Sequence, residues 1–249
     1  MKIHAYIINL QHATKRWEHM RNNLESLGVS YTRIEAVYGD QLAEPIEGYN
    51  EHKYNVLTGK VTNKREIGCY FSHMKAMEEF LKSDQPYALI LEDDVTLPKE
   101  IEQLLASSIQ HEKNWDMIRL TSSRNSTFLP FARLSENHEL AYNLRVLKNT
   151  GAYFVNRHAA YCCTTRMLPM CLPYDVALDR DWDYGFKTAC IAPLPVKLEA
   201  EFPGQIPKAK RIYFYRATTF HLFHLLTRFE RHFHRYRYLR DARTCTGDK

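Results

Sequence analysis

The chain of 249 residues is 45% hydrophobic and 25% charged, which excludes a disordered or fibrous protein and suits one large α/β domain, alone or with an appendage. No apolar run approaches the roughly 20 residues of a membrane-spanning helix, so we expect no transmembrane anchor. The net charge of +5 is uneven, because residues 207–249 hold eleven Lys and Arg against three Asp and Glu.

The six cysteines show no Cys-x-x-Cys spacing, and two of them, Cys162 and Cys163, are adjacent. This pattern suits neither a zinc site nor a disulfide framework. Residues 1–10 lack the long apolar region of a signal peptide. We therefore expect a mature, unexported protein in the cytoplasm.

The first 40 residues have the pattern of a β-α-β unit. Residues 2–10 are mostly apolar and predict a buried strand, and residues 31–37 alternate like a second one. Between them, apolar residues recur at helical spacing, with Thr14 as the expected cap and Gly28 as the expected left-handed stop. Such a unit favours a parallel sheet.

Residues 39–63 are polar and contain Pro45, Gly48 and Gly59, so we expect a long surface loop. Asn63 and Glu66 are spaced as a capping box before a predicted helix over residues 67–81. The next segment, residues 87–91, is a continuous apolar run and predicts an interior strand.

The residues after an acidic cluster at 92–94 also predict alternating helices and strands. Pro98 suits the first turn of a helix that reaches about residue 110, and residues 116–120 predict a strand. A strand at residues 152–155, a helix at about 157–167 and an acidic loop at 175–183 come next. We expect one domain over residues 1–206, followed by a basic aromatic tail over residues 207–249.

Three acids, Glu92, Asp93 and Asp94, stand at the carboxyl end of the interior strand. Carboxylates crowded at the mouth of an apolar strand repel one another, and a bound cation would relieve that cost. If the chain stays extended, Glu92 and Asp94 point to one side and Asp93 to the other. Mg²⁺ or Mn²⁺ suits such oxygen ligands. The alternative is a solvated loop or a helix-capping turn.

Several ordered motifs resemble glycosyltransferase family 25, which includes the bacterial lipooligosaccharide galactosyltransferases. They are Ile7-Ile8-Asn9-Leu10 with Arg16-Trp17, Glu66-Ile67-Gly68-Cys69-Tyr70-Phe71-Ser72-His73, Ala88-Leu89-Ile90-Leu91-Glu92-Asp93-Asp94-Val95, and the weaker Gly151-Ala152-Tyr153 and Pro173-Tyr174-Asp175. The resemblance covers about residues 1–200. It implies a GT-A-like fold, a UDP-sugar donor, usually UDP-galactose and sometimes UDP-glucose, and inversion at the anomeric carbon.

The resemblance also implies roles for single residues. The expected nucleotide-sugar-binding residues are Asn9, Leu10, Arg16, His73, Glu92, Asp93 and Gly151. Asp94 and Glu92 would hold the metal, Mn²⁺ or Mg²⁺, although the cluster reads Glu-Asp-Asp where many GT-A enzymes have Asp-x-Asp. The alternatives are a structural role for His73 and a carboxylate partner for Arg16. We hypothesise that Asp94→Ala abolishes transfer with little loss of folding.

An inverting transfer needs one general base for the acceptor hydroxyl. The acidic segment offers Asp175, Asp179, Asp181 and Asp183. Asp175 matches the family's Pro-x-Asp and is favoured over Asp181. For each of these acids, the alternative is an acidic surface loop or a helix start.

The tail predicts an amphipathic helix. Its apolar face would hold Leu222, Leu225, Leu226, Phe229, Phe233 and Tyr236, with positive charge from Arg228, Arg231 and Arg235. This pattern is typical of a helix at an anionic membrane surface, and the alternative is a helix packed on the domain with a solvated basic face.

The sequence thus predicts an inverting hexosyltransferase that moves a sugar, expected to be galactose, from a UDP-sugar to a lipooligosaccharide core acceptor. It would work in the cytoplasm, at or near the inner face of the cytoplasmic membrane. Two alternatives stay open: a nucleic-acid- or membrane-binding protein that uses the tail, which has nine Phe and Tyr, and a non-catalytic sugar-nucleotide binder. For a hexosyltransferase we expect no nucleic-acid partner.

Overall fold

A computed structural model describes residues 3–246 except 203, 205 and 208, so Lys2 of the first expected strand lies outside the described residues. The core is an eight-stranded sheet in which six strands run in one direction and two, β7 and β8, are reversed. In spatial order the strands are β2 (Ser30–Glu35), β1 (His4–Asn9), β3 (Tyr87–Glu92), β8 (Ala152–Asn156), β5 (Met117–Arg119), β9 (Thr188–Ala192), β7 (Glu139–Asn143) and β6 (Phe128–Arg133). The expected α/β fold with a mainly parallel central sheet flanked by helices is confirmed.

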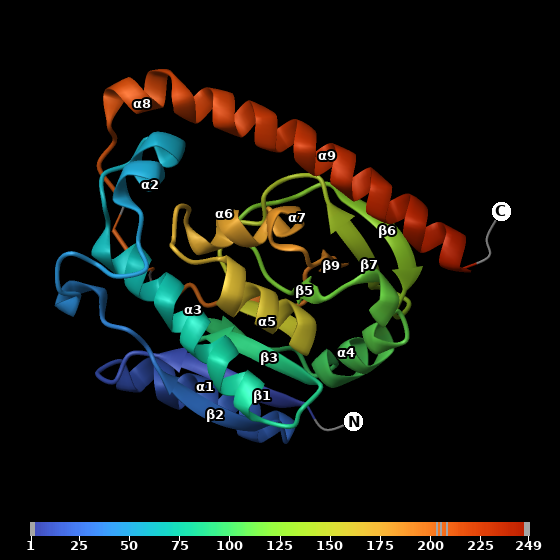
Figure 1. Cartoon of the computed structure of the whole chain (residues 1–249). Coiled ribbons are helices and arrows are strands. Elements are labelled where there is room, and N and C mark those ends of the chain that lie inside the picture. The colour runs from blue at the N-terminus through green and yellow to red at the C-terminus, as the bar shows by residue number, and fades with distance from the viewer. Residues whose placement is uncertain (1–2, 203, 205, 208, 247–249) are drawn as a thin grey trace.

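Helices cover both faces of the sheet (Figure 1), which is why its central strands are apolar at almost every position. Tyr6 and Ile8 face α3 (Lys64–Lys82) and α5 (Arg157–Arg166). Ala5 and Ile7 point the other way, into the core with α1 (Thr14–Leu27) and α4 (Ile101–Ile109). The period of two along β1 therefore divides its side chains between two cores.

The helix signals are confirmed in part. Gly28 ends α1 in the left-handed conformation with φ 69°, but α1 has Ala13 at its N-cap and Thr14 as its first residue. Asn63 caps α3 by accepting from the backbone N–H of Arg65. The capping box is otherwise wrong, because Glu66 accepts from Lys60 Nζ at 2.9 Å and from Tyr54. The Glu66 carboxylate is engaged in this ion pair with Lys60 and does not cap the helix start.

The prediction of loops at residues 39–63 and 175–183 is wrong, because both segments contain short helices. Residues 39–63 contain η1 (Gly39–Gln41) and α2 (Glu51–Thr58), which Asn50 caps and Gly59 ends in the left-handed conformation. The acidic segment forms α6 (Tyr174–Leu178) and α7 (Asp181–Tyr184). These helices are too short for a sequence period to show. The remaining short elements are β4 (Val95–Thr96), β10 (Lys197–Leu198) and η2 (Glu112–Asn114).

The tail forms α8 (Tyr213–Ala217) and α9 (Thr219–Thr246), so the expected C-terminal helix is present. Figure 1 shows α9 crossing the molecule from α2 and α8 at one end to β6 and β7 at the other. The expectation that Arg231 and Arg235 supply exposed charge is wrong. Both are buried on the inner face of α9, where Arg231 pairs with Asp179 and Arg235 with Asp181 at 2.7 Å. Buried acids of the domain have drawn these guanidinium groups inward.

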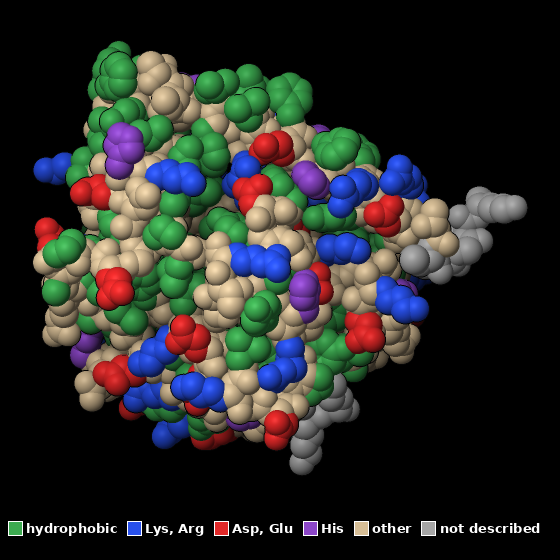
Figure 2. Space-filling view, viewed as in Figure 1, with side chains coloured by type: hydrophobic (Ala, Val, Ile, Leu, Met, Phe, Trp, Pro, Cys, Tyr) green, Lys and Arg blue, Asp and Glu red, His purple; other side chains and the backbone are tan. Residues whose placement is uncertain are grey.

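The outer face of α9 is apolar. The six apolar side chains expected on one face do share it, each with 52% to 67% of its surface exposed. Tyr213 and Phe214 of α8 are also exposed, and Figure 2 shows hydrophobic side chains gathered along this edge. We call these eight residues the apolar ridge: Tyr213, Phe214, Leu222, Leu225, Leu226, Phe229, Phe233 and Tyr236. Among the described helices, none is long and apolar enough to cross a membrane.

The inner face of α9 should make stability depend on pH. Burial, with the charges of Lys148 and Arg216, lowers the pKa of His224 from 6.5 to about 4. Between these values the unfolded chain binds a proton that the folded protein does not, so stability falls as the pH drops from 6.5 toward 4. Because solvent screens this partly exposed ring, we expect a loss of about 1 kcal/mol at pH 5 relative to pH 7.5.

Urea unfolding of the wild type and of His224→Gln at both pH values measures this contribution. The variant should lose about 1 kcal/mol less than the wild type on acidification. His52→Gln, a change at an exposed histidine of α2, is the control and should behave like the wild type. Equal pH dependence of all three proteins would contradict the assignment.

Candidate active site

A cavity of about 510 Å³ opens at the carboxyl ends of β1 and β3. Ligands of open α/β sheets bind at this edge, because loops diverge there beyond the strand ends. The lining includes the predicted residues Leu10, Arg16, Glu92, Asp93 and Asp94, and also His12, Tyr38, Arg65, Cys69, Ser72 and Asn149. Five of the expected site residues are therefore brought together around one cavity.

One wall of the cavity exists because two glycines permit a close contact. A Cβ atom on Gly68 of α3 would lie 2.6 Å from the carbonyl oxygen of Val37, and one on Gly39 would lie 2.2 Å from that of Lys64. Any larger side chain would push residues 37–39 away from α3. Ser72 holds the same segment by accepting from the backbone N–H of Val37 at 2.8 Å.

Asp93 is engaged by protein groups. Asn9 Nδ2 donates to one carboxylate oxygen at 2.6 Å, and Arg16 Nη1 donates to the other at 2.8 Å. Asn9 is itself fixed by Arg33, which donates to its side-chain oxygen at 2.5 Å. Asn9 is almost fully buried, so it reaches the cavity only through Asp93. These bonds connect α1 to the end of β3. Arg16 thus pairs with a neighbouring carboxylate, as the alternative to a phosphate-binding role expected.

Asp94 differs from Asp93 in having an oxygen without a partner. Its Oδ1 is buried and makes no hydrogen bond to any described residue, while Oδ2 lies 3.6 Å from Arg16 Nη1. Burial, with the negative charge of Glu92, raises the pKa of Asp94 to about 7. A divalent cation would supply the missing partner and remove both penalties, so the donor set fits Mg²⁺ or Mn²⁺.

The assumed alternation of the three acids is wrong beyond Glu92. The strand ends there, and residues 93–94 form a turn, so all three carboxylates line the same cavity. The negative charge of Glu92 adds to the effect of burial in raising the pKa of Asp94. The turn, and not the pleat of a strand, brings them together.

Glu92 is held by a buried network. Its Oε1 accepts from Thr150 Oγ1 at 2.6 Å and lies 3.3 Å from His73 Nε2. Burial acts to raise the pKa of Glu92, but the hydrogen bond and charge of His73 outweigh it and hold this pKa below its usual value. Glu92 therefore stays negative beside Asp94.

His73 is fully buried behind Glu92 and does not line the cavity. Its Nδ1 lies 3.0 Å from the hydroxyl of Tyr153, and its ring stacks on Tyr174 with centroids 4.3 Å apart. The ring orientation is therefore set on both sides. The sequence motif found this histidine, but its contact with the cavity is made through Glu92.

Gly151 also stands behind the cavity. Its N–H donates to the side-chain oxygen of Asn149 at 2.6 Å, and its carbonyl accepts from the N–H of Glu92 at 2.8 Å. A Cβ atom here would lie 2.7 Å from Val95 and 2.8 Å from Asn149. The glycine thus lets residues 149–151 pass close to the acidic turn and brings Asn149 into the lining.

The two candidate bases lie in different environments. Asp175 has one oxygen 3.3 Å from Lys148 Nζ and 3.5 Å from the backbone nitrogen of Asn149, next to the cavity lining. Asp181 is fully buried, pairs with Arg235 and accepts from the N–H of Trp182 at 3.0 Å. Asp181 does not line the cavity. The geometry favours Asp175, and the identity of the base stays a prediction.

Several lining residues were not found from the sequence. Cys69 lies in a motif segment, one turn before His73, yet it gave no chemical signal of its own. Burial, followed by the charge of Glu92, raises the pKa of the Cys69 thiol well above its usual value. Arg65 forms an ion pair with Asp40 at 2.7 Å at the rim, and this contact between η1 and the start of α3 has no local sequence pattern.

Comparisons with known proteins identify the family of the chain. The family model "Glycosyltransferase family 25 (LPS biosynthesis protein)" matches residues 2–176. "Glycosyltransferase 25 family member" of Aedes aegypti is 30% identical over 46% of this chain and 20% of its own length. "Procollagen galactosyltransferase 1-B" of Xenopus laevis is 26% identical over 48% of this chain and 21% of its own.

A third relative is bacterial. "Lacto-N-neotetraose biosynthesis glycosyltransferase LgtE" of Neisseria gonorrhoeae is 29% identical over 62% of this chain and 57% of its own length. The chain thus spans about a fifth of the two animal relatives and somewhat more than half of the bacterial one. The family match covers the acidic turn, Asp175 and the cavity lining except Gly204 and Ile206. The expected resemblance is confirmed, and the chain belongs to glycosyltransferase family 25.

Proposed function

We propose that this glycosyltransferase moves galactose from UDP-galactose to a saccharide of the lipooligosaccharide core, with inversion at the anomeric carbon. The observation that carries the proposal is the unpartnered Asp94 oxygen beside Glu92, in a cavity at the carboxyl ends of two strands. The names of the relatives from Xenopus laevis and Neisseria gonorrhoeae support the choice of sugar and acceptor. A cavity of about 510 Å³ suits a ligand of nucleotide size.

We further propose that Asp94 and Glu92 hold Mn²⁺ or Mg²⁺. A bound ion of this kind would offset the charge of a diphosphate leaving group. The protein contributes a rigid support, because Glu92 is fixed by Thr150 at 2.6 Å and Asp93 is fixed by Asn9 and Arg16. With Asp93 engaged, the two carboxylates on either side of it are the ones available for the ion.

The base in this proposal is Asp175. It would accept the proton of the acceptor hydroxyl as the oxygen attacks the anomeric carbon from the side opposite to UDP. Lys148 Nζ lies 3.3 Å from this carboxylate and would hold it in place beside the cavity. A single displacement with one base inverts the anomeric configuration.

The test is a panel of UDP-sugars with lipooligosaccharide core acceptors, followed by mass spectrometry, in Mn²⁺ and then after chelation. We expect one added hexose, from UDP-galactose, in the metal-containing reactions only. Transfer that persists in full after chelation would contradict the metal site. Donor binding without transfer or hydrolysis, for every acceptor, would favour the non-catalytic alternative.

We also propose that the apolar ridge rests on an anionic lipid surface, which would place the enzyme at the inner face of the cytoplasmic membrane near a lipid-linked acceptor. Eight large apolar side chains share this edge, and Arg228, Arg237 and Arg240 are exposed beside them. An apolar strip flanked by cations matches the lipid tails and the anionic headgroups together. Arg231 and Arg235 are buried on the inner face of α9 and add no charge to its outer face. The outer face is therefore poorer in positive charge than a nucleic-acid-binding surface requires.

Sedimentation with lipid vesicles tests the ridge. We expect the wild type to bind vesicles that contain phosphatidylglycerol, and Leu225→Glu with Phe229→Glu to weaken binding at least about tenfold, because two charges enter the apolar contact. Tyr161→Glu changes an equally exposed aromatic on α5 and should bind like the wild type. Unchanged binding of the double variant would count against the proposal.

A further inference from the structure

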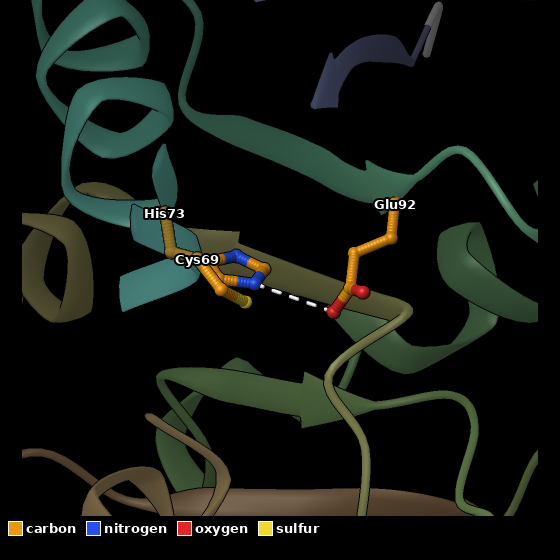
Figure 3. Close-up of side chains that lie close together, drawn as sticks. All are labelled: Cys69, His73 and Glu92. Atoms are coloured by element: carbon orange, nitrogen blue, oxygen red, sulfur yellow. Dashed lines mark ion pairs between the residues drawn. The ribbon is translucent and has the colours of Figure 1, made fainter. Parts of the chain in front are cut away.

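Cys69, His73 and Glu92 form a cluster of metal-ligating types at the edge of the cavity. Cys69 and His73 are one turn apart on α3 and face the end of β3, where Glu92 points toward them (Figure 3). One potential ligand atom from each residue lies within 4.8 Å of the other two. Cys69 and Glu92 also line the cavity, so an ion here would be reached from it.

We propose that these three residues form a binding site for a transition-metal ion of the Zn²⁺ type. Its ligands would be Cys69 Sγ, His73 Nε2 and Glu92 Oε1. Three protein ligands with a fourth position open to the cavity is the arrangement of an accessible zinc site. The set of sulfur, imidazole and carboxylate prefers Zn²⁺ to the harder Mg²⁺ and Mn²⁺.

The distances support the proposal. His73 Nε2 and Glu92 Oε1 are 3.3 Å apart. Two ligands at about 2.0–2.1 Å from a tetrahedral ion lie roughly 3.3–3.4 Å apart, which is the separation found here. The thiol needs only a modest shift to complete the set, since it is already within 4.8 Å of both atoms.

The surroundings orient the ligands as the outer contacts of metal sites do. The Tyr153 hydroxyl lies 3.0 Å from His73 Nδ1 and can accept a hydrogen bond from Nδ1–H. His73 Nε2 lies 3.2 Å from Thr150 Oγ1, a contact that a bound ion would replace. Thr150 donates to Glu92, and Tyr174 stacks on the imidazole. Binding would release two protons to solvent, one from the Cys69 thiol and one from His73 Nε2, so that His73 binds as the neutral ring protonated at Nδ1.

This site shares Glu92 with the ion that we propose at Asp94. An ion held by Cys69 and His73 would draw the Glu92 carboxylate away from Asp94, so Zn²⁺ should inhibit transfer even when Mn²⁺ is in excess. This consequence rests on the proposed function, whereas metal binding by the three residues does not. Zn²⁺ would then act as a regulator of the enzyme and not as its working metal.

Cobalt spectroscopy of the full chain tests binding without any activity measurement. After chelator treatment, one equivalent of Co²⁺ should produce a thiolate-to-cobalt charge-transfer band and visible bands of tetrahedral cobalt, and Zn²⁺ should abolish both. Cys69→Ser should lose the charge-transfer band, and Glu92→Gln should weaken Co²⁺ binding at least about tenfold, as loss of a metal ligand does. Cys171→Ser, at a partly exposed cysteine outside the cavity lining, is the matched control and should keep every band.

The outcomes separate the two proposals. No band in the wild type, or a band that survives Cys69→Ser, would overturn the zinc-type site whether or not the enzyme transfers sugar. If Cys69→Ser fails to fold, Glu92→Gln and the wild-type stoichiometry decide the same question. Cobalt bands in a protein without transferase activity would leave the site standing while the proposed function fails. In an active enzyme, we expect Zn²⁺ to lower the Mn²⁺-dependent rate at least tenfold, and the ratio of rates with and without Zn²⁺ to approach one in Cys69→Ser.

Discussion

Asp94→Asn should lower the rate of sugar transfer by roughly a thousandfold or more while the protein stays folded. The substitution keeps the shape of the side chain but removes the charge that we propose holds the metal ion. Burial and Glu92 raise the pKa of Asp94 to about 7, so the ionised carboxylate costs stability at any pH above that value. Without a divalent cation at pH 8, the variant should therefore be more stable than the wild type, by up to about 2 kcal/mol. Transfer rates and urea unfolding measure the two effects.

Asp93→Asn is the contrasting variant, because both oxygens of Asp93 have hydrogen-bond partners whereas Asp94 Oδ1 has none among the described residues. It accepts from Arg16 and Asn9, so its loss of charge should lower the free energy of unfolding by about 1.5–3 kcal/mol. Asp94→Ala should behave like Asp94→Asn in transfer. A folded Asp94→Asn protein with full activity would end the metal hypothesis, and a loss of stability as large as that of Asp93→Asn would show that Asp94 has a structural partner.

Arg235→Ala should destabilise the protein by about 3–5 kcal/mol, the second large effect that we expect. Arg235 and Asp181 are both fully buried and lie 2.7 Å apart, so the substitution leaves a carboxylate without a partner in the core. Arg228→Ala, at an exposed position of the same helix, should change stability by less than about 0.5 kcal/mol. Urea unfolding at pH 7.5 gives both values.

The same experiment tests the role of Asp181. If Asp181 is structural, Asp181→Asn should lower stability, while the protein that remains folded keeps its turnover rate. Asp175→Asn should instead lower the turnover rate with little loss of stability. Asp175 lies beside the cavity lining, and its ion-pair partner among the described residues is the partly exposed Lys148. A stable, inactive Asp181→Asn protein would return Asp181 to the list of candidate bases.

The sequence predicted best those parts of the fold that local periodicity determines. The β-α-β unit of β1, α1 and β2, the buried strand β3 and helices α3 and α5 were all expected. Strands β6, β7 and β9 were not. Pro130 interrupts the apolar run of β6, although its partner β7 follows closely in the chain, whereas β7 and β9 pair with each other across a long stretch of chain. The reversed direction of β8 has the same origin, since a short apolar run carries no information about the neighbour that it joins.

The candidate site divides in the same way. The acidic turn was found because three acids directly follow an apolar run, and five expected residues line the cavity. Asp181 was a candidate because it belongs to an acidic segment, but its partner Arg235 lies 54 residues further on. The contact between Cys69, His73 and Glu92 joins a helix to a strand end, and only the packed sheet brings them together.

The inward-facing arginines of α9 have a practical consequence for anyone preparing shortened forms of this protein. Removing residues 207–249 would strip away the counterions of Asp179 and Asp181 together with Tyr238 and Leu239, which pack in the sheet core. A truncated protein would then aggregate for reasons unrelated to lipid. Point substitutions on the outward side chains are the safer way to separate the proposed membrane attachment from folding.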